Sequence, residues 1–161
     1  MMMIQAKPLS PEAFAPFSQV LTGKGRGEER HAFAARMENL RPEAKPNMTF
    51  MSVLPAAAPI RIERLERHSY SNEAFTPLNG TRHLVAVCPS GENGKPDLSG
   101  LIAFEADGSQ AVNYNAGIWH APRTAISPPG EFIMFRWDDG SDLDTEIWPL
   151  ESHIEVNLYL N

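Results

Sequence analysis

Apolar and polar residues alternate along most of the chain from residue 31 onward, or apolar residues form short runs that end at turn residues. This pattern is typical of strands that bury one face. Prolines and glycines fall mostly between the runs, which favours a barrel of short antiparallel strands. We predict strands at residues 31–38, 48–54, 60–70, 74–78, 82–88, 101–105, 110–114, 119–125, 132–137, 145–150 and 153–158.

A helix signal follows a short strand that is predicted at residues 2–7. Ser10 is a suitable N-cap, Pro11 fits the first helical position, and Glu12 adds an acidic residue to the first turn. One or two helical turns are therefore expected, and helix signals are scarce elsewhere. The predicted fold class is all-β with one or two short helices.

Length and charge narrow the functions that the chain can have. Its 161 residues suit one domain over residues 1–161, and its formal net charge is −6. Nucleic acids and anionic membranes need clustered basic residues in a partner, so neither is expected here. The lone Cys88 lies in an apolar run and is expected to be buried and reduced. No apolar run has the length of a membrane span or of a signal peptide, so a cytoplasmic protein is expected.

Candidate metal ligands lie in two separate stretches. Glu66 and His68 are two residues apart, so on a strand both project from the same face. His120 lies far downstream, and imidazole together with carboxylate suits a divalent transition metal. We predict Glu66, His68 and His120 as metal ligands. Structural alternatives stay open, because Glu66 can belong to a solvated face, the histidines can be hydrogen-bonded core residues, and Glu73 can be a turn residue.

The order of these residues resembles the two sequence motifs of cupins. The departures are Glu66 where a histidine is usual, Ile60 where a glycine is expected, and Tyr114 where a proline is usual. The resemblance implies a cupin-like β-barrel with a metal site between facing strands. The residues that carry it are Glu66, His68, Glu73 and Gly80 in the first motif and Gly108, Gly117 and His120 in the second.

Longer blocks make the chain resemble the ureidoglycolate lyase family of allantoin catabolism. This resemblance implies a homodimeric cupin-like barrel that cleaves a small ureide, ureidoglycolate, to glyoxylate and urea, and it associates the chain with nickel. The blocks lie at residues 65–68, 74–80, 95–99, 112–114 and 119–122.

Two departures from the family concern groups that can hold the substrate or move a proton. Family members often carry an arginine at the end of the strand that corresponds to residues 49–54, where this chain has Val53, Leu54 and Pro55. A second imidazole after Trp119-His120 is also common, where this chain has Ala121. Both departures leave the identity of the substrate open.

Cleavage of ureidoglycolate needs a base for the carbon-2 hydroxyl, an acid for the departing nitrogen and a cation for the carboxylate. Glu73 and His120 are the candidate catalytic residues, and Glu73 is either a fourth metal ligand or the base. Asn113 and Tyr114 are candidates to bind the urea end of the substrate, with ordinary strand packing as the alternative. Arg82 and Arg123 are weaker candidates to pair with the carboxylate.

Two alternative functions stay open. One is another metal-dependent cupin enzyme, such as an isomerase or a dioxygenase, that acts on a small hydroxy acid. The other is a cupin without catalytic activity that binds a small acid. Metal identity and dependence on oxygen would separate the first from a lyase, and a persistent lack of turnover would indicate the second.

Overall fold

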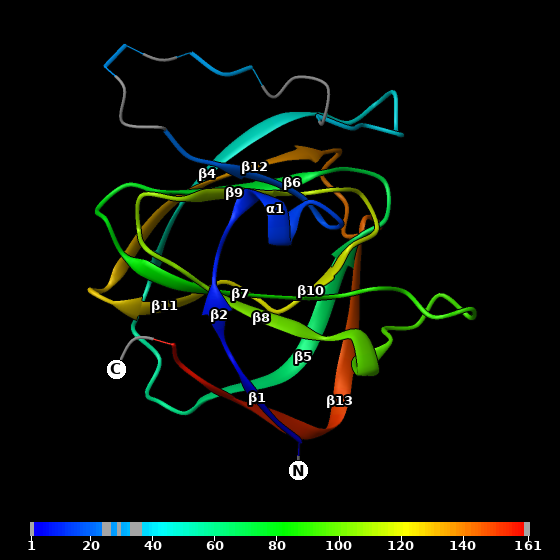
Figure 1. Ribbon diagram of the computed structural model, residues 1–161. Helices are drawn as coiled ribbons and strands as arrows, with labels where there is room; N and C mark the ends of the chain where they lie inside the picture. The colour runs from blue at the N-terminus through cyan, green and yellow to red at the C-terminus, as the bar shows by residue number, and fades with distance from the viewer. Residues whose placement is uncertain (1, 24–26, 29, 33–36, 160–161) are drawn as a thin grey trace.

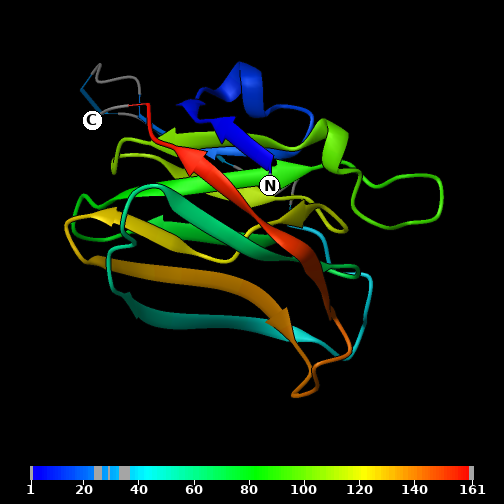
Figure 2. The same ribbon diagram turned by 90° about the horizontal axis from the view of Figure 1, so that it is seen from below.

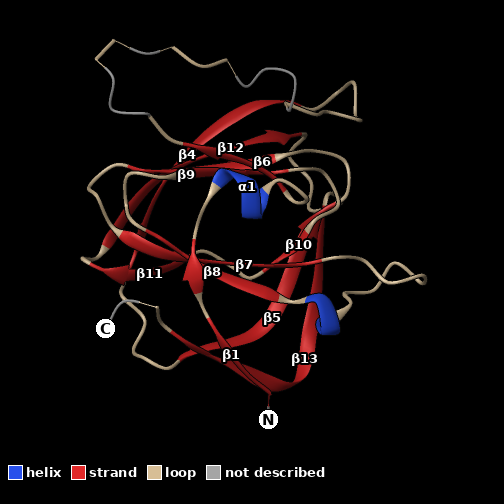
Figure 3. Cartoon of the chain, in the orientation of Figure 1, coloured by secondary structure: helices blue, strands red, loops and turns tan. Residues whose placement is uncertain are grey.

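Two β-sheets make up nearly all of the computed structural model, which describes residues 2–23, 27–28, 30–32 and 37–159 (Figures 1 and 3). The first sheet has eight strands in the order β1-β13-β5-β10-β7-β8-β2, with β11 also paired to β7. Its strands are β1 (Met2–Gln5), β2 (Lys7–Pro8), β5 (Ile60–His68), β7 (Arg82–Cys88), β8 (Ile102–Ala106), β10 (Trp119–His120), β11 (Thr124–Ser127) and β13 (Thr145–Asn157).

The second sheet has five strands in the order β3-β9-β6-β12-β4. These strands are β3 (Ser18–Leu21), β4 (Lys45–Val53), β6 (Glu73–Pro77), β9 (Ala111–Tyr114) and β12 (Gly130–Asp138). The long pair β4 and β12 lies at one end of the molecule and α1 (Pro11–Phe14) at the other (Figure 2). A short 3-10 helix, Leu98–Gly100, precedes β8.

The eight-stranded sheet curls until its two edges nearly meet. Its edge strands β1 and β2 are separated in sequence by Ala6 alone, whose N–H donates to the carbonyl of Asn157 at 2.8 Å. One hydrophobic core comes from this sheet and the segments beside it, and a second lies between the two sheets. Strand β7 contributes to both, since Leu84 faces the first core and Val85 the second. The five-stranded sheet therefore packs against the eight-stranded sheet, whose strand β7 is buried on both faces (Figure 1).

Two glycines of the cupin-like motifs meet in this fold. Gly108 has φ +88°, and a Cβ at this position would lie 2.2 Å from the carbonyl oxygen of Gly80, whose φ is +71°. A side chain is excluded at Gly108 both by the left-handed backbone and by this close approach. Each motif thus places a glycine in a turn, and these two turns contact each other.

The all-β barrel predicted from the sequence is confirmed. Strand β7 has the predicted bounds, and Ser10 caps α1 by accepting a hydrogen bond from the N–H of Ala13 at 3.2 Å. Cys88 is buried and free, and burial raises the pKa of its thiol to about 12. Within the described part of the chain, no helix is long and apolar enough to cross a membrane.

Several strand predictions need correction. Strand β3 was not predicted, residues 119–125 divide into β10 and β11, and residues 145–150 and 153–158 join into β13. In β13 the pairing with β5 shifts register between Pro149 and Ile154, which explains why the sequence pattern breaks there. Of the strand predicted at residues 31–38, residues 33–36 lie outside the described residues, and the described ones are not in a strand.

Candidate metal and substrate site

Three strands bring one acidic and two imidazole side chains together between the sheets. His68 ends β5, Glu73 begins β6, and His120 lies in β10, directly beside β5. The strand pairing sets Glu73 opposite Tyr114 of β9 and Arg136 of β12. A cavity of about 330 Å³ adjoins the group, and Glu66, His68, Glu73, Phe75, Arg123 and Arg136 are among the residues that line it.

The carboxylate of Glu73 lies between the two imidazoles. Its Oε1 is 3.2 Å from Nε2 of His68, and its Oε2 is 3.2 Å from Nε2 of His120. All three side chains are buried, and one ligand atom of each lies within 4.8 Å of the others. Three of the facing atoms have no hydrogen-bonding partner of good geometry: Nε2 of His68, Nε2 of His120 and Oε2 of Glu73. This donor set fits a divalent transition metal, which would satisfy all three atoms at once.

The orientation of His120 is fixed on both sides of its ring. Its Nδ1 lies 2.9 Å from the carbonyl oxygen of Ile118, which can only accept a hydrogen bond, so Nδ1 carries a proton. In the neutral imidazole the lone pair is then on Nε2 and points at Glu73. The ring of Tyr114 stacks on His120 with centroids 4.3 Å apart and an angle of 7° between the planes. On the other imidazole, Nδ1 of His68 lies 3.4 Å from Oγ1 of Thr145.

Opposite effects act on the pKa values of this group. Burial alone would raise the pKa of Glu73, but the adjacent imidazoles of His120 and His68 outweigh burial and lower it. Burial disfavours the charged form of His68, yet Glu73, with smaller contributions from Asp144 and Glu66, leaves the pKa of His68 raised. The site therefore keeps an ionised carboxylate that attracts positive charge, either as protons on the imidazoles or as a cation.

The chain matches the sequence model described as ureidoglycolate lyase over residues 1–157. It belongs to the ureidoglycolate lyase family. A putative ureidoglycolate lyase of Agrobacterium fabrum is 32% identical over 155 residues, which cover 96% of this chain and 95% of the relative. A ureidoglycolate lyase of Pseudomonas paraeruginosa is 34% identical over 150 residues, 88% of each chain.

Among solved structures, RmlC from Streptococcus suis in complex with dTDP-D-xylose aligns with a TM-score of 0.37 and 12% identity. The alignment covers 81% of this chain and 54% of that one, and a likeness this distant carries no argument. The family membership rests on the sequence comparisons, and it favours the lyase over the other cupin functions considered from the sequence.

In this member of the ureidoglycolate lyase family, Glu66 and His68 line the same cavity, as their spacing predicts. Glu73 is more central than expected, because it contacts both histidines. Glu66 lies at the margin of the group, with Oε1 3.8 Å from Nε2 of His120 and a fifth of its side chain exposed. The predicted ligand roles of Glu66, His68 and His120 stay predictions.

The two predicted substrate-binding residues do not line the cavity. Asn113 accepts a hydrogen bond from Nδ2 of Asn72 at 2.8 Å and donates to Oε1 of Gln19 at 3.3 Å. Tyr114 is buried against His120. Arg82 is ion-paired with Glu105 and does not line the cavity either, so their roles toward substrate also stay predictions.

Sequence reasoning missed two arginines at the cavity. Arg64 precedes Glu66 by two residues on β5, so the alternation that selected Glu66 applies to Arg64 as well. On β12, Phe132, Met134 and Arg136 occupy alternate positions, of which the first is buried and the other two line the cavity. A charged residue on the inward face of an alternating strand was the available signal.

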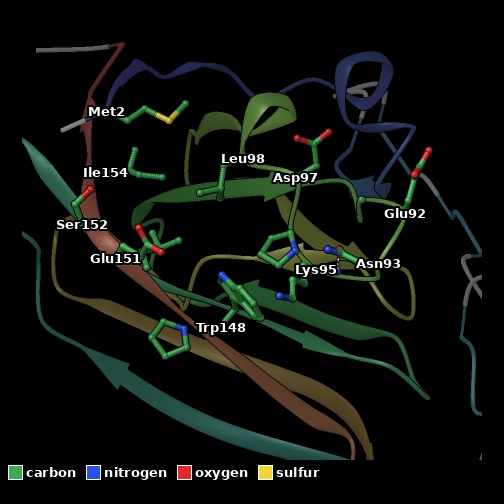
Figure 4. A pocket seen from close by; sticks show the side chains of 14 residues that line it. Met2, Glu92, Asn93, Lys95, Asp97, Leu98, Trp148, Glu151, Ser152 and Ile154 are labelled. Atoms are coloured by element: carbon green, nitrogen blue, oxygen red, sulfur yellow. Dashed lines mark hydrogen bonds between the residues drawn. The ribbon is translucent and has the colours of Figure 1, made fainter.

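A larger cavity of about 720 Å³ lies apart from this site, between the segment before the 3-10 helix and β13 (Figure 4). There the amino group of Lys95 lies 5.0 Å from the ring centroid of Trp148. The carboxylates of Glu92, Asp97 and Glu151 point from different sides and do not converge on one point (Figure 4). We therefore take the smaller cavity beside Glu73 as the candidate functional site.

Proposed function

We propose that this chain cleaves ureidoglycolate to glyoxylate and urea. The observation that carries the proposal is the buried group of His68, Glu73 and His120, in which both imidazole Nε2 atoms and Oε2 of Glu73 lack hydrogen-bonding partners. A cavity of about 330 Å³ adjoins this group, a size that suits a small ureide. Membership of the ureidoglycolate lyase family supports the same substrate.

We propose that His68, Glu73 and His120 hold a divalent metal, and family resemblance suggests nickel. Both imidazole Nε2 atoms face the carboxylate without good hydrogen bonds, which supports ligation through these atoms. The position of Glu73 between the two imidazoles supports a ligand role for this residue, because its carboxylate can bind the same cation as they do. A bound metal would supply a Lewis acid that favours ionisation of the substrate hydroxyl.

Glu66 is the residue that we assign as the base. Its carboxylate borders the same cavity and is partly exposed, so substrate can reach it. Ureidoglycolate is a carbinolamide, and its carbon-2 hydroxyl gives its proton to Glu66. The carbonyl of glyoxylate forms as the carbon–nitrogen bond breaks, and the electron pair of that bond passes to the urea nitrogen. Glu66 then returns the proton to this nitrogen, so no water is consumed and the reaction is a lyase reaction.

Release of glyoxylate and urea by the purified chain tests this proposal. We expect the two products in equal amounts, and we expect Glu66→Gln to lower kcat at least about 100-fold while bound metal stays at the wild-type level. Glu63→Gln is a matched control, because Glu63 is an exposed residue of the same strand and does not line the cavity. Wild-type protein that releases neither product would refute the lyase assignment, and loss of metal in Glu66→Gln would refute the base assignment.

The proposal also includes one domain over residues 1–161 and a homodimer in the cytoplasm. Apolar side chains on the outer face of the five-stranded sheet support a second copy: Met48 is 69% and Phe50 57% exposed on β4. Ile133 and Phe135 of β12 lie opposite them in register. Sedimentation equilibrium should give twice the chain mass, and Phe50→Lys should shift it toward a monomer. A wild-type monomer at micromolar concentration would contradict the dimer.

A further inference from the structure

Arg123 holds a guanidinium group at the cavity in a fixed position. The residue lies between β10 and β11, and it lines the cavity together with Glu66 and Glu73. Its Cζ lies 3.5 Å from the ring centroid of Phe75 and 5.2 Å from that of Phe132. The hydroxyl of Tyr114 lies near it. Aromatic rings and one hydroxyl therefore position the group without neutralising its charge.

The donors of this guanidinium are not fully used. Its Nε and Nη1 are buried and have no hydrogen-bonding partner, and no described carboxylate forms an ion pair with it. Tyr114 cannot supply the missing negative charge, because burial raises the pKa of its hydroxyl. Burial, followed by the charge of Arg123, lowers the pKa of His83 to about 3. A buried cation without a counter-ion is costly unless a ligand brings one.

Other arginines near the site are already compensated or are open to solvent. Nη2 of Arg136 pairs with Oδ2 of Asp138 at 3.0 Å, and Arg82 pairs with Glu105. Arg64 is an exposed residue, so water screens its charge. Arg123 is thus the cation at this cavity whose charge most requires a partner from outside the chain.

We propose that Arg123 binds the carboxylate of the substrate and thereby makes the site prefer small carboxylic acids over their uncharged analogues. Charge-assisted hydrogen bonds from a guanidinium to a carboxylate are both strong and directional. Val53 lines the same cavity at the strand end where the family resemblance leads one to expect an arginine. Arg123 supplies positive charge to the same cavity from the segment between β10 and β11. The inference rests on the proposed function, because it names how that substrate is held.

Binding of glycolate and of its uncharged amide, glycolamide, separates a carboxylate anchor from a merely structural residue. Isothermal titration calorimetry would give the Kd of each ligand for the wild type, Arg123→Met and Arg123→Lys, and bound metal would be measured for each protein. We expect Arg123→Met to weaken glycolate binding about 10- to 100-fold, the loss expected for charge-assisted hydrogen bonds. Glycolamide binding should change less than about twofold. Arg123→Lys should keep part of the preference for glycolate, because it keeps the charge.

Arg61→Met is the matched control, since Arg61 is an exposed arginine on β5 that does not line the cavity. It should bind glycolate as the wild type does. Equal losses for glycolate and glycolamide in both Arg123 variants would overturn the proposal, as would wild-type protein without a preference for glycolate. The two proposals fail separately: protein that prefers glycolate through Arg123 but releases no urea from ureidoglycolate refutes the lyase alone.

Discussion

Arg41 and Arg123 both have buried guanidinium nitrogens, and the surroundings of these two groups differ. Arg41 donates from Nη1 to Oδ2 of Asp139 at 2.6 Å, and its Nη2 lies 3.3 Å from Oδ2 of Asp144. These contacts tie the segment before β4 to the connection between β12 and β13. Arg123 faces aromatic rings and one hydroxyl, and two of its nitrogens have no partner. Two carboxylates pair with the first cation, although its Nε has no partner, whereas no described carboxylate pairs with the second.

The carboxylates of the two regions differ in the same way. Asp144 accepts a hydrogen bond from the N–H of Tyr70 at 2.7 Å and another from Oγ of Ser71 at 2.5 Å. Oε2 of Glu73 faces His120 without a hydrogen bond. Removal of one partner from a buried ion pair destabilises the folded state, and a buried charge without a partner is available to a ligand. Substitutions near Arg41 should therefore change stability, and those near Glu73 should change activity.

The largest effect is expected for Glu73→Gln. The amide is neutral and cannot serve both imidazoles as a carboxylate does, so bound metal should be lost and product release should fall about 1000-fold or more. The urea midpoint for unfolding should stay close to that of the wild type. Full metal content together with full activity would remove Glu73 from the site.

Arg41→Met should have the reverse signature. Removal of the guanidinium leaves the buried carboxylate of Asp144 without its cation, so the free energy of unfolding should fall by about 2 kcal/mol. Urea unfolding followed by tryptophan fluorescence gives this value. The kcat for each folded molecule should be unchanged. If activity falls and stability does not, the distinction between the two regions is wrong.

The third effect is a change in stability with pH, which we expect from His83. Its ring is buried against the edge of Phe132, and its pKa is lowered from 6.5 to about 3. Between these values the unfolded chain binds a proton that the folded chain does not. The free energy of unfolding should therefore fall as pH falls, by up to about 1.4 kcal/mol per pH unit. His83→Gln removes this group, so its stability should fall less between pH 6.5 and 4.5. Parallel pH profiles would contradict the assignment.

Tyr114→Phe should have the smallest effect. It removes one hydroxyl that contacts Arg123 and keeps the ring that stacks on His120. Loss of this polar contact should cost about 1 kcal/mol, so KM should rise about fivefold with kcat unchanged. An unchanged KM would mean that the aromatic rings alone position Arg123. A large fall in kcat would instead restore Tyr114 as a residue that contacts the substrate.

Local patterns in the sequence predicted much of the fold. The apolar run of β7, the cap at Ser10 and the shared face of Glu66 and His68 depend on neighbouring residues, and each is confirmed by the geometry. Strand β3 was missed because four residues after a short helix carry too little alternation. The continuity of β13 was missed because a register shift in its pairing with β5 interrupts the apolar pattern.

The centre of the site depends on contacts that no local pattern contains. Glu73 reaches both histidines because β5, β6 and β10 lie in two facing sheets, and the sequence spacing left its role open. Asn113 and Tyr114 are adjacent, so they point to opposite faces of β9, and only Tyr114 faces His120. Arg123 was a weak candidate from the sequence, because its lack of a partner is a property of the folded chain.

The most direct test of the account is the dependence of product release on metal. Glyoxylate and urea would be measured from ureidoglycolate with protein as purified, after removal of metal by a chelator, and after return of nickel, manganese or zinc. We predict equal amounts of the two products, loss of both after chelation, and recovery with one of the three metals. Turnover that is unaffected by the chelator would contradict a metal held by His68, Glu73 and His120.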